Sequence, residues 1–449
     1  MAARLLISLS LYFFLFFRLV SAEIVPLTIL HTNDLHAHLL PDEKGQGGAA
    51  IIAGYYRQAR NEVKNVLILD AGDLISGTPV SSLFKGDPIF HVLNHWGISA
   101  AALGNHDFDY GWERIERFRE IAEFPLLCAN AFVLGPDGMQ HPPADEEYHI
   151  FTWGALRVGV IGVIAEWTPQ MTTRDACRGV TFVSSIPALQ RLVPTVAEKS
   201  DLVVVLSHVG IEHDQKIAEQ VPRIHLIVGG HSHTRLAEAK VVNGIPIVQT
   251  GSNGRFVGRI DLAADTKKKQ IVNFAYRLLP VDKTLAPEDP ETAESVKQWE
   301  KQVGEIVDRP LGTATENLSS AELCAIAEAA FLEAADAEYA YQNPGGTRGT
   351  IPKGAFTLRA VWNVFPFENT LVTAELQGKA IPAEFHGHRP IDPERKYRIV
   401  TNSFVRDQWR RNHPDLAGLE WTDTGLSLRD SVVRYIERRK TISPVVLER

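Results

Sequence analysis

Short apolar runs alternate with helix-like stretches from Leu27 to about Pro280, and this alternation restricts the fold more than any other feature of the sequence. The runs include LTIL (27–30), LRVGVIGVI (156–164) and DLVVVLSH (201–208), and stretches such as WERIERFREIAEF separate them. Strands that alternate with helices of this length are typical of a layered α/β domain. We therefore predict an α/β fold for this part, closed by an antiparallel pair in GRFVGRIDLAAD and QIVNFAYRLL.

A change in composition divides the chain after these closing strands. At 449 residues the chain is longer than one hydrophobic core usually organises, so two domains are expected. The stretch APEDPETAESVKQWEKQVGEIVD is strongly charged and opens with proline, which predicts one long exposed helix. We therefore predict a first domain over residues 23–285, a linker helix over 286–309 and a smaller α/β domain over 310–449.

The amino terminus has the pattern of a secretory signal. Arg4 precedes the apolar run LLISLSLYFFLFF, and the small residues VSA supply a cleavage site that ends at Ala22. We predict that residues 1–22 are a signal peptide and that the protein is secreted or periplasmic. The alternative is a membrane anchor left by an uncut signal, because Arg18 interrupts the run near its end. No other stretch is long and apolar enough to span a bilayer.

The net charge of −8 excludes an overall electrostatic attraction to nucleic acid or to anionic membranes. An anionic substrate must therefore meet local positive charge or a metal ion. Cys128, Cys177 and Cys324 are too few and too scattered for a disulfide framework, so we predict structural cysteines with one pair at most. No feature of the sequence specifies an oligomeric state.

Polar residues gather where the apolar runs end. HTNDLH, DAGD, LGNHDFD, LSH and VGGHSH each follow such a run, and in an open α/β sheet the carboxyl ends of the strands form the edge where ligands bind. Asp34 and His36 lie two residues apart, so an extended backbone would present both on one face as half of a metal site. The candidate ligands at these strand ends are Asp34, His36, Asp73, Asn105, His208, His231 and His233.

These candidates are more than one metal ion needs. A zinc ion takes three or four protein ligands, so the set suits two ions that share a carboxylate. Two ions about 3.5–4 Å apart can clamp a phosphoryl group and generate a hydroxide nucleophile near neutral pH. Asn105 fits such a site because its neutral amide oxygen adds no charge that would repel phosphate. Mixed histidine, aspartate and asparagine ligation suits zinc, manganese, iron or cobalt alike.

The same motifs resemble a known family. TILHTNDLHAH, DAGDLISG, ALGNHDFDYG, VVLSHVG and IVGGHSH are similar, in order and spacing, to the five motifs of the calcineurin-like binuclear metallophosphoesterases, and in particular to the secreted 5′-nucleotidases. NPGGTR (343–348), VFPFENTLVTAELQG (364–378) and TGLSLRDSVVRYI (424–436) resemble that family's C-terminal substrate domain. The resemblance implies a layered metallophosphoesterase β-sandwich flanked by helices, followed by a smaller α/β substrate-binding domain.

The resemblance also implies a role for the residues at these positions. One metal ion would be held by Asp34, His36 and His233. The other would be held by Asn105, His208 and His231, and the carboxylate of Asp73 would bridge the two ions. His106 would pair with Asp109 and either stabilise the transferring phosphoryl group or protonate the leaving oxygen. Asn343 and Arg348 would face the active site from the second domain, with the guanidinium on the substrate phosphate.

Other polar residues near the motifs receive lesser roles. We predict His31 and His38 to be flanking or loop residues, and Asp107 to be a hydrogen-bond partner behind the ligands. Arg359 and Arg389 are candidate companions on the phosphate, although their spacing does not distinguish them from surface charges.

The second domain departs from the family pattern where the nucleobase would bind. The family clamps the base between two aromatic rings, one in an insertion after the LxG element and one in a GGDGF-like loop. Here ELQGKAIPAEFHGHRP runs almost directly into IDPERKYRIVTNSF, and RDQWRRNHPDLAGLEWTDTG follows TNSFV. Phe404, Trp409 and Trp421 are the candidates to replace the missing rings, because stacking supplies much of the affinity for a base.

The sequence therefore predicts a metal-dependent phosphoester hydrolase that acts on a small molecule and not on nucleic acid. By resemblance it would hydrolyse nucleoside 5′-monophosphates to nucleoside and phosphate, through attack by a metal-activated hydroxide. One alternative is a related esterase or pyrophosphatase acting on cyclic nucleotides, nucleotide sugars, sugar phosphates or a sulfur-containing anion. Another is a non-catalytic metal- or ligand-binding protein of the same fold, against which the complete ligand set argues.

Overall fold

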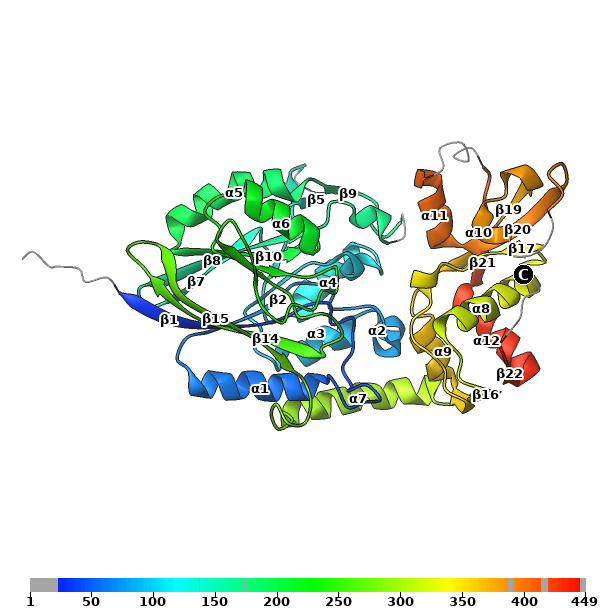
Figure 1. Ribbon diagram of the computed structural model, residues 1–449, viewed down its shortest axis with the longest axis horizontal. Helices are drawn as coiled ribbons and strands as arrows, with labels where there is room; N and C mark the ends of the chain where they lie inside the picture. The colour runs from blue at the N-terminus through cyan, green and yellow to red at the C-terminus, as the bar shows by residue number, and fades with distance from the viewer. Residues whose placement is uncertain (1–22, 137, 173–174, 387–390, 413–418, 445–449) are drawn as a thin grey trace, which may run out of the picture.

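The computed structural model describes residues 23–136, 138–172, 175–386, 391–412 and 419–444. The predicted signal segment 1–22 and Arg389 lie outside the described residues. Figure 1 shows a large N-terminal domain and a smaller C-terminal domain, with helix α7 (Pro290–Val307) running along the first and leading to the second.

Two six-stranded sheets pack face to face in the N-terminal domain. In the first, the order β15-β14-β1-β2-β3-β4 is formed by β1 (Ile24–Thr32), β2 (Val66–Asp70), β3 (Ala100–Ala102), β4 (Leu126–Leu127), β14 (Phe256–Asp265) and β15 (Gln270–Pro280). In the second, the order β12-β13-β11-β10-β8-β7 is formed by β7 (Tyr148–Trp153), β8 (Leu156–Ile164), β10 (Leu202–His208), β11 (Leu226–Gly229), β12 (Lys240–Val242) and β13 (Ile245–Val248). Ile29, Leu69, Val158 and Val204 are among the apolar side chains buried between the two sheets.

Helices cover both outer faces of this sandwich (Figure 1). One side carries α1 (Ala49–Glu62), α2 (Pro79–Phe84), α3 (Asp87–Asn94) and α4 (Glu113–Ile121), and the other carries α5 (Ser185–Lys199) and α6 (Ile211–Gln220). A small sheet of β5 (Ala131–Leu134), β6 (Gln140–His141) and β9 (Val180–Phe182) lies beside them. The predicted α/β class, a β-sandwich flanked by helices, is confirmed.

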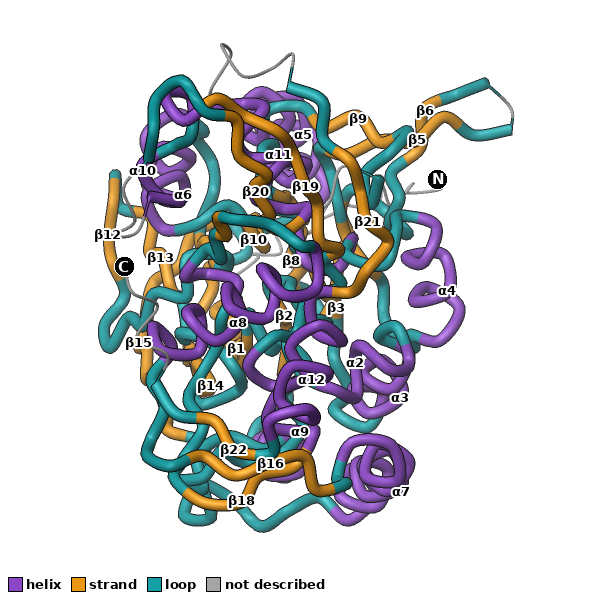
Figure 2. Tube along the Cα trace, turned by 90° about the vertical axis from the view of Figure 1, so that its right-hand side faces the viewer, coloured by secondary structure: helices purple, strands orange, loops and turns teal. Residues whose placement is uncertain are grey.

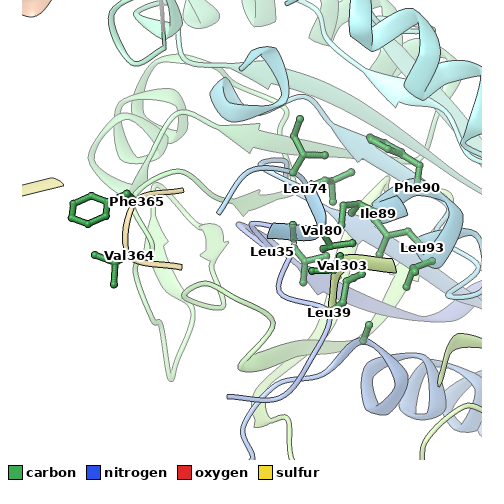
Figure 3. Close-up of a cluster of buried hydrophobic side chains, with 14 of the residues drawn as sticks. Leu35, Leu39, Leu74, Val80, Ile89, Phe90, Leu93, Val303, Val364 and Phe365 are labelled. Atoms are coloured by element: carbon green, nitrogen blue, oxygen red, sulfur yellow. The ribbon is translucent and has the colours of Figure 1, made fainter. Parts of the chain in front are cut away.

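Helix α7 differs from the predicted exposed linker. Val296, Val303 and Val307 form a buried stripe along its length, and the helix packs against α1, α2 and α3. Figure 3 shows Val303 beside Leu39 and Val80 of the N-terminal domain. The predicted long helix is present, but it is exposed on one side only. Its buried side was missed because these few apolar residues recur on a single helical face and are outnumbered by charges in the linear sequence.

The C-terminal domain is a second, smaller α/β unit. Its four-stranded sheet, in the order β17-β20-β19-β21, comprises β17 (Tyr339–Ala340), β19 (Thr370–Gln377), β20 (Lys396–Asn402) and β21 (Thr422–Ser427). A three-stranded sheet comprises β16 (Pro310–Ala314), β18 (Gly354–Thr357) and β22 (Thr441–Ile442). The helices are α8 (Ser320–Ala335), α9 (Leu358–Val364), α10 (Ala383–His386), α11 (Ser403–Asn412) and α12 (Leu428–Arg439). Figure 2 shows α8 and α12 side by side between the two sheets.

The cysteines and the helices bear on two further predictions. Cys128, Cys177 and Cys324 are buried and free of disulfides, which agrees with structural cysteines. Among the described residues, no helix combines the length and the apolar character needed to cross a bilayer.

Candidate metal centre

Parallel strands of both sheets end at the side of the sandwich that faces the C-terminal domain (Figure 1). Asp34 follows β1, Asp73 follows β2, Asn105 follows β3, His208 ends β10 and His231 follows β11. Because these strands point the same way, each delivers its polar residue to one place.

Asp34, His36 and His233 form the first group of candidate ligands. Oδ1 of Asp34 lies 3.3 Å from Nε2 of His233 and 3.9 Å from Nε2 of His36. The two Nε2 atoms lie 3.0 Å apart. Asp34 is fully buried, whereas the His233 ring is partly exposed. A carboxylate oxygen and two imidazole nitrogens that converge at this spacing fit a divalent metal ion.

Asp34, Asp73 and His208 form the second group. Oδ2 of Asp73 lies 3.2 Å from Nε2 of His208 and 3.8 Å from Nε2 of His36, so this carboxylate faces both groups. Nδ1 of His208 donates a hydrogen bond to the carbonyl oxygen of Ala71 at 2.7 Å, which leaves Nε2 as the ring nitrogen that faces the Asp73 carboxylate. Within the described residues this buried Nε2 has no hydrogen-bond partner, as suits an atom that ligates a cation.

Asn105 and His231 face each other beside the second group. Oδ1 of Asn105 lies 2.8 Å from Nδ1 of His231, and the His231 and His208 ring centroids are 5.2 Å apart. The backbone N–H of His231 donates to both carboxylate oxygens of Asp34, at 3.0 and 3.1 Å. The structure therefore brings Asn105, His208 and His231 into one region, and their oxygen and nitrogen atoms match the donor chemistry of a divalent cation.

Most of these residues leave their strands in a left-handed backbone conformation. The φ angle is 51° at Asp34, 48° at His36, 56° at Asp73, 73° at His231 and 52° at His233. Non-glycine residues adopt this conformation rarely. Sharp reversals at the strand ends therefore aim the side chains at the centre.

The carboxylate of Asp107 holds the loops behind these groups. Its Oδ2 accepts hydrogen bonds from the backbone N–H groups of Gly104 (2.7 Å) and Asp73 (3.1 Å). Its Oδ1 accepts from those of Leu74 (3.1 Å) and Ile75 (3.3 Å). These bonds agree with the predicted place of Asp107 as a hydrogen-bond partner behind the ligands.

His106 and Asp109 form a hydrogen-bonded pair at the edge of the centre. Nδ1 of His106 donates to Oδ2 of Asp109 at 2.8 Å, so Nε2 is the ring atom left for a substrate. Burial alone would lower the pKa of His106, but the carboxylates of Asp109 and Asp73 raise it to about 9. These two carboxylates therefore favour the protonated form of the ring.

Two cavities meet over these groups, between the domains. The smaller cavity, of about 460 Å³, is lined among others by Tyr110, Thr172, Asn343, Phe367, Phe404 and Gln408. The larger cavity, of about 810 Å³, is lined among others by His36, His38, Lys44, Arg255, Glu300 and Arg359. His106, Arg348 and Phe367 line both cavities.

Arg348 is the basic residue that the C-terminal domain contributes where the cavities meet. Its guanidinium carbon lies 5.4 Å from the centroid of the Phe367 ring. Burial lowers the pKa of Arg348, while the negative charges of Asp73 and Asp109 oppose that shift across the domain boundary. Among the described residues no carboxylate forms an ion pair with this guanidinium, so its donors are available to an anionic ligand.

Asn343 reaches the smaller cavity in a fixed orientation. Nδ2 of the buried Asn402 donates to Oδ1 of Asn343 at 2.9 Å and to Oε1 of Gln342 at 2.9 Å. Because the carbonyl side of the Asn343 amide is engaged, its NH₂ group is the side left for a ligand.

The aromatic residues of the smaller cavity differ from those predicted. Trp409 packs in a separate hydrophobic cluster with its ring centroid 5.9 Å from that of Trp421, and in the described part of the chain neither tryptophan lines the cavity. Phe404 lines it together with Phe367, whose ring stacks at 5.7 Å and 21° on that of His106. The prediction for Trp409 and Trp421 is wrong because α11, which begins at Ser403, turns Phe404 toward the cavity and Trp409 toward the domain core, where Trp421 packs against it.

Three residues given lesser roles are placed as follows. His31 is fully buried on β1 rather than flanking it, and neither ring nitrogen has a hydrogen-bond partner among the described residues. Nδ1 of His38 lies 2.9 and 3.2 Å from two backbone carbonyl oxygens. Arg359 pairs with Glu300 and Asp308, so it ties α9 to α7 and is not a free phosphate ligand.

The segment after β8 contributes contacts that the motifs did not reveal. Nε1 of Trp167 donates to Nε2 of His231 at 3.3 Å, and Oγ1 of Thr172 donates to Oδ1 of Asp109 at 2.8 Å. Both residues follow the buried strand LRVGVIGVI, and a polar continuation after a strand is the signal that marked the other loops.

A phosphate ester is the kind of substrate that this arrangement suits. Its anionic oxygens require positive charge on more than one side, which Arg348 of the C-terminal domain and metal ions held by the candidate ligands of the N-terminal domain would supply. Fold and site together thus define a two-domain, metal-dependent phosphoesterase.

Family comparisons agree with this class. The calcineurin-like phosphoesterase family matches residues 27–235, and the 5′-nucleotidase C-terminal domain family matches residues 302–386. The chain belongs to the calcineurin-like phosphoesterases, in the group that carries a 5′-nucleotidase C-terminal domain. Because this is a family of enzymes that use divalent metal ions, the comparison argues against the alternative of a non-catalytic binding protein with the same fold.

Individual relatives resemble the chain over most of its length. The trifunctional nucleotide phosphoesterase of Bacillus subtilis is 30% identical over 404 residues, which are 79% of this chain but 27% of that protein. The 5′-nucleotidase of Bos taurus is 28% identical over 411 residues, 80% of this chain and 71% of that protein. The crystal structure of a 5′-nucleotidase precursor from Thermus thermophilus has a TM-score of 0.83 at 27% identity, covering 94% of this chain and 98% of its own.

Proposed function

We propose that the protein hydrolyses nucleoside 5′-monophosphates to nucleoside and phosphate at a centre of two divalent metal ions. The observation that carries the proposal is the convergence, from two domains, of the metal-facing groups and the unpaired Arg348 on a cavity that contains Phe367. The names of the similar 5′-nucleotidases support the same substrate class.

The ligand chemistry supports two ions. Asp34, His36 and His233 would hold one, Asn105, His208 and His231 would hold the other, and Asp73, which faces both groups, would bridge them. When bound, the ions supply Lewis-acid charge that promotes attack of water on phosphorus. The donor set is compatible with zinc, manganese, iron or cobalt.

The remaining residues divide the work of binding and proton placement. Arg348 would bind two phosphate oxygens through its planar guanidinium, because no carboxylate among the described residues competes for it. Nε2 of His106 would hold a proton toward the leaving oxygen, since Nδ1 is committed to Asp109. Asn343 would donate its NH₂ group to the ribose or phosphate.

The nucleoside would occupy the smaller cavity. Phe367 and Phe404 offer aromatic faces to a base, and Gln408 offers an amide at the same wall. A cavity of about 460 Å³ lies within the range of pockets that bury small ligands.

A second candidate is hydrolysis of larger phosphoesters or anhydrides, such as cyclic nucleotides or nucleotide sugars. The observation that favours it is the cavity of about 810 Å³ that adjoins the first at Arg348 and Phe367. A substituent on the far side of the phosphate would find space there.

We propose in addition that residues 1–22 direct export, so that the enzyme works outside the cytoplasm. The support is the run LLISLSLYFFLFF followed by VSA. Amino-terminal sequencing of the protein recovered from the medium or the periplasm tests this: a first residue of Glu23 is expected, and a retained Met1 contradicts cleavage.

The test of function is phosphate release by the manganese-loaded protein, comparing AMP with ribose 5-phosphate at equal concentration. We expect kcat/KM to be at least about tenfold higher for AMP, which corresponds to about 1.4 kcal/mol from stacking of the base. Phe404→Leu, at a ring that lines only the smaller cavity, should reduce the rate on AMP and leave that on ribose 5-phosphate within about twofold. Equal rates with both substrates in the wild type would discard the nucleotidase assignment and keep the phosphoesterase.

A further inference from the structure

The segment 165–172 runs over the edge of the centre and contacts three of its residues. The backbone N–H of Ala165 donates to the carbonyl oxygen of His208 at 3.0 Å, and Trp167 donates to His231 as described. At its far end, Oγ1 of Thr172 donates to Oδ1 of Asp109 at 2.8 Å.

We propose that Thr172 is a positioning residue for the His106–Asp109 pair, holding the carboxylate of Asp109 so that Nε2 of His106 stays directed at the leaving oxygen. The inference rests on the role proposed above for that pair. It assigns a function to a segment that carries none of the recognised motifs.

The two oxygens of the Asp109 carboxylate are occupied by different donors. Oδ2 accepts from Nδ1 of His106 at 2.8 Å, and Oδ1 accepts from Thr172 at the same distance. An ionised carboxylate can only accept, so the Thr172 hydroxyl must be the donor. The side-chain torsion of an aspartate carboxyl is soft, and a second donor on the opposite oxygen restricts its rotation.

Thr172 is itself held in place. It is 4% exposed, and its backbone N–H donates to the carbonyl oxygen of Thr168 at 3.3 Å. Thr168 is fully buried, and its Oγ1 donates to the carbonyl oxygen of Ala165 at 2.7 Å. Because the backbone N–H of Ala165 is hydrogen-bonded to His208 at the end of β10, this series of hydrogen bonds fixes the position of the Thr172 hydroxyl relative to a candidate metal ligand.

Thr172 also lines the smaller cavity beside Met171. A direct contact with substrate is therefore the competing explanation, and the two explanations predict different kinetics. A positioning residue lowers kcat and spares KM, whereas a binding residue raises KM. A positioning residue acting through His106 also matters most when the leaving oxygen needs a proton.

The experiment compares Thr172→Val, which keeps the shape and removes the donor, with Thr172→Ser, which keeps the donor. Phenyl phosphate and p-nitrophenyl phosphate are the probes, since the phenolate of the first needs protonation far more than that of the second. For Thr172→Val we expect kcat to fall about tenfold on phenyl phosphate and less than about twofold on p-nitrophenyl phosphate, with KM within about twofold. Thr172→Ser should recover kcat to within about twofold of the wild type.

Two controls identify a merely structural effect. Thr181→Val, at an exposed threonine of β9, should change neither rate. Thr172→Val combined with Asp109→Asn should lose no more than Asp109→Asn alone, because both act through His106. The melting temperature of each variant is measured beside its rates.

An equal loss on both aryl phosphates, a rise in KM at constant kcat, or a Thr172→Ser variant as slow as Thr172→Val would each overturn the proposal. Because the probes contain no nucleoside, failure of the nucleotidase proposal is seen separately. A wild type that hydrolyses the aryl phosphates and not AMP would end that assignment and leave the comparison at Thr172 intact.

Discussion

Nη2 of Arg429 donates a hydrogen bond to the carbonyl oxygen of Pro366 at 2.9 Å. Nε of the same guanidinium donates to the carbonyl oxygen of Phe365 at 2.8 Å, and its carbon lies 3.8 Å from the centroid of the Trp362 ring. Arg429 is 4% exposed. The buried guanidinium of Arg429 thus holds the backbone of residues 365–366, next to Phe367 in the cavity wall.

Replacement of this arginine should affect both stability and substrate binding. Arg429→Lys is expected to lower the free energy of unfolding by about 2–3 kcal/mol, because an ammonium group cannot reach the same carbonyls and leaves buried acceptors unpaired. KM for AMP should rise several-fold as Phe367 loses its support. Urea unfolding and steady-state kinetics measure the two effects. Arg434→Lys, at a more exposed position of the same helix, should change neither; a destabilised Arg429→Lys with unchanged KM would separate Arg429 from the cavity.

Loss of the arginine from the cavity junction should weaken binding of phosphate itself. Arg348→Ala is expected to reduce kcat/KM for AMP by about 10²-fold and to raise the inhibition constant of inorganic phosphate, because charge-assisted bonds to the phosphate are lost. Arg348→Lys should recover only part of the loss, since an ammonium group is not a planar fork. Arg359→Ala is the matched control, because Arg359 is already paired with Glu300 and Asp308. Equal phosphate inhibition in Arg348→Ala and wild type would remove Arg348 from the phosphate site.

The shared carboxylate should control metal content. Asp73→Asn is expected to bind less than the full complement of metal and to lose activity by about 10³-fold or more, while its circular dichroism stays native. Metal at about 100 times its dissociation constant should stabilise the wild type by about 2.7 kcal/mol and the variant much less. Elemental analysis and thermal unfolding with and without chelator measure this. The exposed Asp175→Asn serves as control; full metal content in Asp73→Asn would contradict a bridging role.

His31 should make the stability of the fold depend on pH. Burial lowers the pKa of His31 to about 3 in the folded state, whereas an imidazole in the unfolded chain titrates near 6.5. The unfolded state therefore binds more protons below pH 6.5, so stability is lost as the pH falls from 6.5 toward 3. At pH 5 this loss is about 2 kcal/mol.

Urea unfolding of His31→Leu at pH 7.5 and pH 5 isolates this contribution. The variant should lose about 2 kcal/mol less than the wild type between the two values, because it has no imidazole to protonate on unfolding. It should also gain stability at pH 7.5, since two buried ring nitrogens without partners are replaced by an apolar group. His149→Leu, at a half-exposed ring, should leave the difference between the two pH values unchanged. Parallel pH curves for wild type and His31→Leu would contradict the assignment.

The metal-facing loops could be predicted from the sequence because their signal is local. Asp34, Asp73 and His208 each stand where a buried strand ends, and parallel strands bring such ends together in any α/β sandwich. Trp167 and Thr172 also follow a strand, but tryptophan and threonine are not typical metal ligands, so the same signal did not single them out.

The cavity wall could not be predicted, because it depends on packing between distant segments. Phe367 faces His106 only once β19 and α12 have placed its loop, and Arg429 holds that loop from 61 residues further on along the chain. Trp409 was a reasonable candidate because it is aromatic. Phe404 and Trp409 both lie on α11, but Phe404 is on the side of the helix that faces the cavity and Trp409 is on the side that faces the domain core. The buried face of α7 was hidden in the same way by its charged neighbours.

The left-handed backbone conformation lowers the stability of the fold at five residues that the metal centre requires, namely Asp34, His36, Asp73, His231 and His233. A glycine would relieve the torsional cost, of order 1 kcal/mol at each of these positions, but only by deleting the side chain that the centre requires. Inactive variants with glycine at His36 or His233 should therefore have a melting temperature no lower than that of the metal-free wild type. A selection for heat resistance alone, without a test of activity, would therefore enrich such variants. A heat-stable form of this enzyme has to be sought elsewhere in the chain, with these reversals left as they are.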